Sequence, residues 1–343
     1  MRQTWTIEKA HRWYNEQPYL IGANFIPSSA INQLDMWQAS TFDPDTIRRE
    51  LGYASRIGMN VMRVFLHDLL WEQDEYGFGD RIDAYLAIAA SYQIKTIFVI
   101  FDDCWKQTFS LGEQPPPIPY THNSGWVQSP GFHVVNNPDS WLRLEGYVKG
   151  LLERFKRDGR VLMWDVYNEP GNTTSLNNSR PGVMQGERSL PLLKAAFDWV
   201  RSVDDLSQPV TAGMWNFTRP FDRLNQFSLE NSDVLTFHSY EPPQALSDRI
   251  KQLSKTGRPM ICTEYMARSA GSTFDGCLPL MKKYNVGAIN WGLVTGKTQT
   301  IYPWGWHSGL GEPDIYFHDI FHPDGTWLYP SEERVIKNVT GVD

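Results

Sequence analysis

The chain has 343 residues, 41% of them hydrophobic and 21% charged, and a net charge of −7 at pH 7. A chain of this length buries a large core without needing a metal or disulfide staple. Its acidic balance and the lack of a lysine- and arginine-rich stripe argue against a nucleic-acid partner. No apolar run approaches the roughly 20 residues of a membrane helix, so we expect no membrane partner either.

Short runs rich in β-branched and aromatic residues recur along the chain, and most are followed by a segment with helical periodicity. The predicted strands are 19–25, 60–66, 95–101, 161–168, 209–215, 234–240, 259–265 and 287–293. The predicted helices are 44–58, 80–93, 138–158, 189–204, 243–256 and 274–285. Asp43-Pro44 is typical of a helix start, and Gly58 and Gly159 of helix ends. We expect 216–233 and 294–343 to be less regular, with a last helix in the second segment.

This alternation predicts an α/β fold, a (β/α)8 TIM barrel that forms a single domain over residues 1–343. An open doubly wound sheet would carry a glycine-rich G-x-G-x-x-G or Walker turn, and the sequence has neither. In such barrels the catalytic residues lie at the C-terminal ends of the strands. The residues that end each predicted strand are therefore the candidates for a functional site.

Two of these strands end in a glutamate. The strand 161–168 is followed by Glu169 and Pro170, and the strand 259–265 contains Glu264 near its end. A carboxyl group that ends an apolar strand needs a partner or a function, because burying it unpaired costs free energy. Glycoside cleavage requires such a pair, in which one carboxyl protonates the leaving oxygen and the other attacks the anomeric carbon. In a retaining enzyme the two carboxyl groups are about 5–5.5 Å apart.

Asn168-Glu169-Pro170 on the fourth strand and Glu264 on the seventh resemble the two-glutamate pattern of clan A glycoside hydrolases, most closely family five. The resemblance extends over residues 19–295. It implies a retaining glycoside hydrolase that cleaves β-linked glycosides or oligosaccharides through a covalent glycosyl-enzyme, without a cofactor or metal. Glu169 would be the acid/base and Glu264 the nucleophile.

Other strand ends match the same family pattern. The resemblance implies that Arg63 supports the nucleophile, that His238 and Tyr240 contact the two acids, and that Trp291 is the platform under the sugar. Asn168 would hold the substrate 2-hydroxyl. One departure follows the third strand, where many family members have a histidine and this chain has Phe101-Asp102-Asp103-Cys104-Trp105.

Arg63 on an apolar strand also has a physical interpretation that does not depend on the family. A buried guanidinium needs an anionic partner, and Glu264 is a suitable one. Beside Arg63 and Tyr240, we expect the pKa of Glu264 to be lowered and that of Glu169, in drier surroundings, to be raised. These shifts would keep the nucleophile ionised and the acid protonated.

The segment 102–137 is the longest insertion after any predicted strand. Long loops in compact domains are usually functional or disordered, and the prolines and aromatic residues of this one favour order. We therefore interpret it as a wall of the substrate cleft. The residues expected to contact or support the substrate there, or after the first strand, are Asp103, Trp105, Trp126 and Trp37.

Two alternatives remain open at this stage. A metal-dependent barrel hydrolase would carry clustered His and Asp ligands. No His-x-His pair occurs, but Asp102-Asp103 could bind a cation, so this hypothesis is retained. A sugar-binding barrel without catalysis would lose one acid, the arginine or the tyrosine, and this chain retains all of them. The 14 tryptophans suit a core and sugar platforms equally.

The N-terminus lacks the continuous apolar run of a signal peptide, and the three cysteines form an odd, sparse set. Both features favour a cytoplasmic location. The sequence does not predict the sugar configuration or the oligomeric state.

Overall fold

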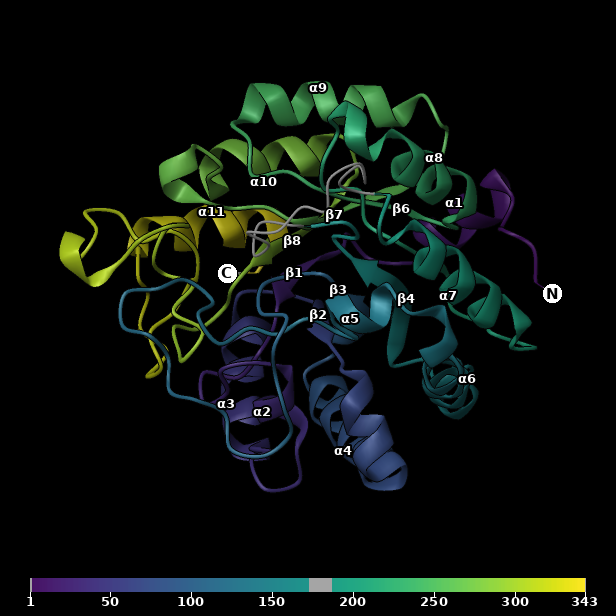
Figure 1. Cartoon of the computed structure of the whole chain (residues 1–343). Coiled ribbons are helices and arrows are strands. Elements are labelled where there is room, and N and C mark those ends of the chain that lie inside the picture. Colours follow the sequence, from purple (N-terminus) through teal and green to yellow (C-terminus); the bar gives the residue numbers. More distant parts are fainter. Residues whose placement is uncertain (1, 173–186, 343) are drawn as a thin grey trace.

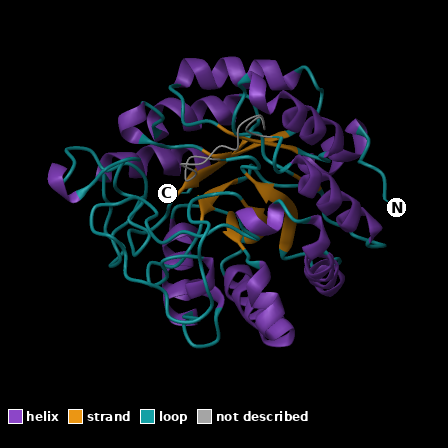
Figure 2. Cartoon of the chain, viewed as in Figure 1, coloured by secondary structure: helices purple, strands orange, loops and turns teal. Residues whose placement is uncertain are grey.

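The computed structural model describes residues 2–172 and 187–342. Parallel strands form one curved sheet at the centre of the molecule, and helices surround it (Figure 1, Figure 2). The strands are β1 Ile21–Asn24, β2 Val61–Phe65, β3 Lys95–Asp102, β4 Val161–Asn168, β5 Val210–Thr211, β6 Leu235–His238, β7 Met260–Glu264 and β8 Gly287–Trp291. All eight coincide with predicted strands, and only β3 extends beyond its predicted range, by one residue.

The sheet closes on itself. Its strand order is β5-β4-β3-β2-β1-β8-β7-β6, and a parallel bridge between Met214 and Phe237 joins the two outer strands. The (β/α)8 barrel predicted from the alternation of strands and helices is thereby confirmed. Register places the strand ends side by side: Asp102 pairs with Asn168, and His238 pairs with Glu264.

The helices form a ring outside the barrel (Figure 1). They are α1 Ile7–Asn15, α2 Gln33–Trp37, α3 Pro44–Arg56, α4 Asp68–Ser91, α5 Phe132–Val135, α6 Leu142–Phe155, α7 Leu190–Ser202, α8 Asp222–Asn231, α9 Pro243–Ser254, α10 Phe274–Lys283 and α11 Pro330–Thr340. All six predicted helices are present, and α11 is the helix expected within 294–343. No helix among the described residues has both the length and the apolar character needed to cross a membrane.

Differences from the predicted helices have local causes. The α4 helix begins at Asp68, well before the predicted 80, and it bends at Asp74, where φ is −160° and ψ is 76°. The bend changes the direction of the helix, so its first turns do not continue the apolar periodicity of the rest. The first predicted turn of α6 is a separate 3-10 turn, Pro138–Ser140. The sequence did not predict α8, which lies in the segment expected to be irregular.

The N-terminal helix α1 closes the bottom of the barrel. Tyr14 packs against the side chains that fill the lower barrel interior, and its hydroxyl donates to the carbonyl oxygens of Met260 and Asn285 at 3.2 and 3.1 Å. The lower interior is apolar, with Leu20, Val61, Ile97, Leu162, Met163, Val234, Ile261 and Ile289. The polar strand ends therefore lie at the other, open end of the barrel.

The prediction that Trp37 contacts the substrate is wrong. The short helix α2 directs Trp37 into the core, where it is fully buried and stacks on Phe42. Its rings also meet Phe78 and Tyr85 edge-on, and its indole Nε1–H donates to the carbonyl of Phe65 at 2.8 Å. A tryptophan with this surrounding stabilises the fold and is closed to the cleft.

We expect Trp37→Ala to lower the free energy of unfolding by about 3–5 kcal/mol, because it leaves a cavity in the core. Trp37→Phe is the matched control, since it keeps an aromatic ring and removes the indole hydrogen bond, and its loss should be smaller. Urea denaturation measures both. A Trp37→Phe protein of unchanged stability but strongly raised KM would instead place this residue at the substrate.

Candidate active site

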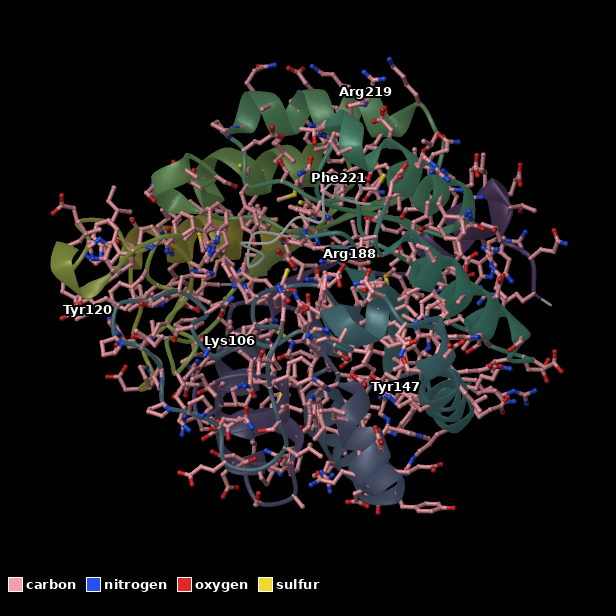
Figure 3. All side chains as sticks on the ribbon, viewed as in Figure 1. Lys106, Tyr120, Tyr147, Arg188, Arg219 and Phe221 are labelled. Carbon is pink, nitrogen blue, oxygen red and sulfur yellow. The ribbon has the colours of Figure 1, made fainter. Side chains whose placement is uncertain are left out.

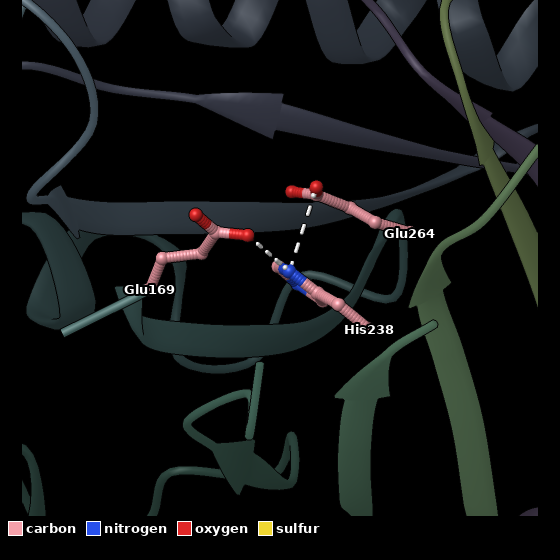
Figure 4. A group of neighbouring side chains, drawn as sticks. All are labelled: Glu169, His238 and Glu264. Atoms are coloured by element: carbon pink, nitrogen blue, oxygen red, sulfur yellow. Dashed lines mark hydrogen bonds and ion pairs between the residues drawn. The ribbon is translucent and has the colours of Figure 1, made fainter. Parts of the chain in front are cut away.

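The two glutamates meet at the C-terminal ends of the strands. Glu169 directly follows β4, Glu264 ends β7, and His238 ends β6 between them (Figure 4). A carboxylate oxygen of Glu169 lies within 4.8 Å of one of Glu264. His238 Nδ1 is 2.8 Å from Glu169 Oε1 and 3.4 Å from Glu264 Oε2. This spacing is shorter than the separation of about 6.5–9.5 Å between the carboxyl groups of an inverting pair.

Glu264 is held by a cation and a hydroxyl. Arg63 Nη1 lies 2.9 Å from its Oε1, and the hydroxyl of Tyr240 donates to its Oε2 at 2.8 Å. Arg63 is fully buried on β2 and also forms an ion pair with Asp165 at 2.8 Å. The buried guanidinium thus has two carboxylate partners, as a buried charge requires. The contact of Arg63 and Tyr240 with Glu264 agrees with the prediction.

Glu169 has different surroundings. Its Oε2 accepts hydrogen bonds from Asn172 Nδ2 at 2.5 Å and from the thiol of Cys104 at 3.1 Å. Its backbone adopts φ of +42°, a left-handed conformation that is costly for a residue with a side chain. Gly171 stabilises this turn, because its N–H donates to the carboxylate of Asp103 at 2.6 Å.

The pKa directions are the reverse of those expected from the sequence. Burial acts to raise the pKa of Glu169, but the hydrogen bond and charge of His238, with the hydrogen bonds from Cys104 and Asn172, lower it below its usual value. Burial raises the pKa of Glu264, and the charge of Glu169 adds to this effect, which outweighs His238, Arg63 and Tyr240. His238 contacts Glu169 more closely than Glu264, and Glu169 also accepts hydrogen bonds from Cys104 and Asn172.

Asn168 connects the arginine to the loop after β3. Its Oδ1 accepts from Arg63 Nη2 at 2.7 Å, and its Nδ2 donates to Asp102 Oδ1 at 2.9 Å. Burial raises the pKa of Asp102 to about 7, although the hydrogen bonds from Asn168 and Trp126 act to lower it. These two partners fix the orientation of the amide that borders the cleft.

Trp291 forms part of the cleft beside the acids. Its ring meets Phe65 and Trp126 edge-on, each with 5.7 Å between ring centroids. Trp126 in turn donates its Nε1–H to Asp102 Oδ2 at 2.7 Å. Trp126 borders a small cavity of about 20 Å³ and is absent from the walls of the main cleft. Of these two tryptophans, Trp291 borders the cleft and Trp126 packs behind it.

The acids open into a pocket of about 870 Å³. Its walls include Trp105, Trp215, Tyr240, Trp291 and Trp304. A second pocket, of about 790 Å³, adjoins it and is bordered by the loop after β3. The two pockets share the lining residues Trp105, His122, Asn123 and Gly305.

The wall between these pockets is built by two long loops, 102–137 and 294–326, which lie side by side (Figure 1). Asn123 N–H donates to the carbonyl of Thr298 at 2.8 Å, and His122 Nδ1 lies 2.8 Å from the carbonyl oxygen of Tyr302. Lys106 lies on the inner part of the first loop and Tyr120 at the outer edge of the molecule (Figure 3). The predicted role of 102–137 as an ordered wall of the cleft agrees with these contacts.

Asp103 was expected to contact or support the substrate, but it does not border the cleft and cannot bind the substrate directly. It is fully buried, and it accepts hydrogen bonds from the hydroxyl of Tyr167 at 2.8 Å and from Ser189. Together with the bond to Gly171, these contacts hold the turn that carries Glu169. Asp103 is therefore a support of the acid and lies outside the sugar-binding surface.

The cleft residues that were missed from the sequence include Cys104, Asn172 and Trp215. Cys104 and Asn172 each follow a strand end by a few residues, which was the only available signal. Trp215 ends the predicted fifth strand, and its indole Nε1–H donates to the carbonyl of Pro170 at 3.1 Å, directly beside the acid.

Glu169, His238 and Glu264 are the one group of metal-binding side chain types, within residues 2–172 and 187–342, whose ligand atoms are close enough to hold an ion. Both oxygens of Glu264 already have partners in Arg63 and Tyr240. A guanidinium 2.9 Å from a ligand oxygen repels a cation at the same place. The donor set therefore fits a hydrogen-bonded pair of acids better than a metal centre.

Comparison with known proteins agrees with this geometry. The family model described as cellulase (glycosyl hydrolase family 5) matches residues 51–296, which include the site residues from Arg63 to Trp291. Comparison with curated proteins gives no match in sequence.

Similar solved structures share the fold at low sequence identity. A variant of GH5_18 from Streptomyces cattleya in complex with Manβ1-4GlcNAc is 14% identical with a TM-score of 0.63, and the similarity covers 93% of this chain and 80% of that one. The endo-1,4-β-mannanase from Rhizomucor miehei is 16% identical with a TM-score of 0.60, covering 93% and 97%. The β-mannanase from the blue mussel Mytilus edulis is 14% identical with a TM-score of 0.60, covering 94% and 91%.

The family match extends from the α3 helix to the end of the eighth strand and contains both glutamates. The chain belongs to the cellulase family, glycosyl hydrolase family 5, and is a glycoside hydrolase.

Proposed function

We propose that Glu264 is the nucleophile and Glu169 the acid/base in the cleavage of β-linked oligosaccharides by double displacement. The observation that supports this assignment best is the pair itself. Its oxygens lie within 4.8 Å, with a guanidinium on Glu264 and proton donors around Glu169. This asymmetry gives the two carboxyls different tasks.

In the first step a carboxylate oxygen of Glu264 attacks the anomeric carbon, and the bond from that carbon to the leaving oxygen breaks. Glu169, in its carboxylic acid form, delivers its proton to that oxygen and becomes a carboxylate, while His238 Nδ1 lies 2.8 Å from its Oε1. Arg63 and Tyr240 orient the attacking carboxylate and stabilise its ionised form. The products are a covalent glycosyl-enzyme and a free alcohol.

In the second step a water molecule attacks the same carbon from the side of Glu169. Glu169, now ionised, accepts a proton from this water, and the bond between the anomeric carbon and Glu264 breaks. Two inversions at one carbon retain its configuration. The hydrogen bonds to Glu169 favour its ionised form at this stage, which agrees with the lowered direction of its pKa.

The substrate class follows from the cleft. Trp291 offers an aromatic face for the sugar beside the acids, and Asn168 offers an amide for its 2-hydroxyl. The adjoining pocket beyond Trp105 gives room for further sugar units. β-Mannosides and β-glucosides are the first substrates to test, because similar structures are named mannanases and the family model is named cellulase.

Removal of the acid tests the proposed roles. In Glu169→Ala, substrates with ordinary leaving groups should lose activity by about 10²–10⁴-fold, because the leaving oxygen receives no proton. Dinitrophenyl glycosides need no proton, so their first step should continue. Added azide should then restore turnover and yield a β-glycosyl azide, identified by NMR. Equal losses for both kinds of leaving group, without azide rescue, would assign the acid/base role to another residue.

The tyrosine at the nucleophile has a separate signature. Tyr240 donates to Glu264 and thereby lowers its pKa, so Tyr240→Phe should raise that pKa. Because the nucleophile acts only above its pKa, the acidic limb of the kcat/KM profile should move to higher pH by about one unit. Phenylalanine keeps the ring that packs on Trp304, at 5.0 Å between centroids. An acidic limb at the parent position would show that Tyr240 does not act on the nucleophile.

A further inference from the structure

The acid/base carboxyl has an unusual hydrogen-bond partner in a thiol. Cys104 follows β3 by two residues, and its Sγ lies 3.1 Å from Glu169 Oε2. The thiol is nine-tenths buried yet borders the main cleft. This residue stands in the segment Phe101-Asp102-Asp103-Cys104-Trp105 at the end of the third strand.

The position of Cys104 is fixed by its backbone. Its N–H donates to Asp102 Oδ1 at 2.8 Å, the same oxygen that accepts from Asn168. The next residue, Trp105, has a positive φ of 67°, which turns the chain into the long loop. The thiol is thus carried by a constrained turn and is directed at Glu169.

The thiol is present as S–H. Burial raises the pKa of Cys104 well above its usual value, and the nearby carboxylates of Glu169 and Asp102 raise it further. A protonated thiol beside a carboxylate oxygen donates a hydrogen bond to that oxygen and keeps its proton. Asn172 donates to the same oxygen at 2.5 Å, so Oε2 has two donors while Oε1 faces His238.

We propose that Cys104 is a positioning residue for the acid/base, which fixes the rotation of the Glu169 carboxyl and stabilises its ionised form in the second step. This inference rests on the role proposed for Glu169. With Oε2 held by Cys104 and Asn172, the carboxyl plane has one orientation, and Oε1 keeps its contact with His238.

A thiol suits the two states that Glu169 must adopt. An S–H group is a weak donor, so it stabilises the carboxylate less than a hydroxyl or an ammonium group does. Glu169 therefore still accepts the proton that the first step needs, and it is stabilised after releasing it. A stronger donor at this place would bias the carboxyl further toward the ionised form.

The protonation of Glu169 also depends on the other charged and titratable groups that face it. These groups lie on or directly after β3, β6 and β7, and they are Asp102, His238, Tyr240 and Glu264. Arg63 of β2 acts indirectly, by its ion pair with Glu264. None of them changes in a Cys104 variant. A shift in the pH profile of such a variant therefore reports the loss of the Cys104 side chain, which donates to Glu169 and also accepts from Asn168 and Asn172 at 3.5 and 3.4 Å.

The test compares Cys104→Ala with Cys104→Ser. Alanine removes the donor, which raises the pKa of Glu169, so the basic limb of kcat/KM should move to higher pH by up to about one unit. Activity on substrates with poor leaving groups should fall by roughly tenfold, since a misoriented acid delivers its proton less well. Dinitrophenyl glycosides should lose less in their first step. Serine restores a donor and should return the basic limb toward or below that of the parent.

Cys277→Ala is the matched control, because its thiol contacts Ser272 outside the cleft and should leave the profile unchanged. The proposal would be overturned if Cys104→Ala folds, keeps the basic limb of kcat/KM at the same pH as the parent, and loses equal activity on both kinds of leaving group. If that result is found while azide rescue of Glu169→Ala succeeds, the acid/base assignment of Glu169 stands and only the role of Cys104 is contradicted.

Discussion

The site depends on one buried charge, the guanidinium of Arg63. It lies inside the barrel with no exposed surface, and isolated it would be prohibitively costly to bury. Closure of the barrel brings it acceptors from three other strands: Asn24 of β1, Asp165 and Asn168 of β4, and Glu264 of β7. Two of these acceptors are carboxylates, so Arg63 links the stability of the upper barrel to the ionisation of Glu264.

The same arginine orders the rest of the cleft. Through Asn168 it reaches Asp102, and through Asp102 it reaches Trp126, on which the edge of Trp291 packs. The amide of Asn168 and the ring of Trp291, which both border the cleft, are therefore held by one chain of contacts that begins at Arg63 and Glu264. Glu169 lies outside this chain and depends on the turn held by Asp103, on His238 and on Cys104. The two acids thus have different nearest partners, although His238 contacts both and Asp102 holds both Asn168 and the backbone of Cys104.

The strand ends could be predicted because a barrel places them at one level, and register confirms that His238 pairs with Glu264. Long-range packing could not be predicted. Trp37 was expected at the cleft, but α2 directs it into the core. The pKa directions were wrong because they depend on the nearest partners of each acid: His238, Cys104 and Asn172 lower the pKa of Glu169, whereas burial raises that of Glu264. No spacing in the sequence encodes these contacts. The contact of Cys104 with Glu169 is likewise not encoded in any spacing of the sequence.

The central claim is that Glu264 becomes covalently bonded to the sugar, and trapping the intermediate tests it most directly. A 2-fluoro glycoside with an activated leaving group slows both steps, but its leaving group restores only the first. The intermediate should therefore accumulate, and mass spectrometry should find the added sugar on the peptide that contains Cys262, Thr263, Glu264 and Tyr265. The sugar on another carboxylate, such as Asp102 or Glu241, would contradict the assignment. A first product of inverted anomeric configuration, measured by NMR before mutarotation, would contradict the double displacement itself.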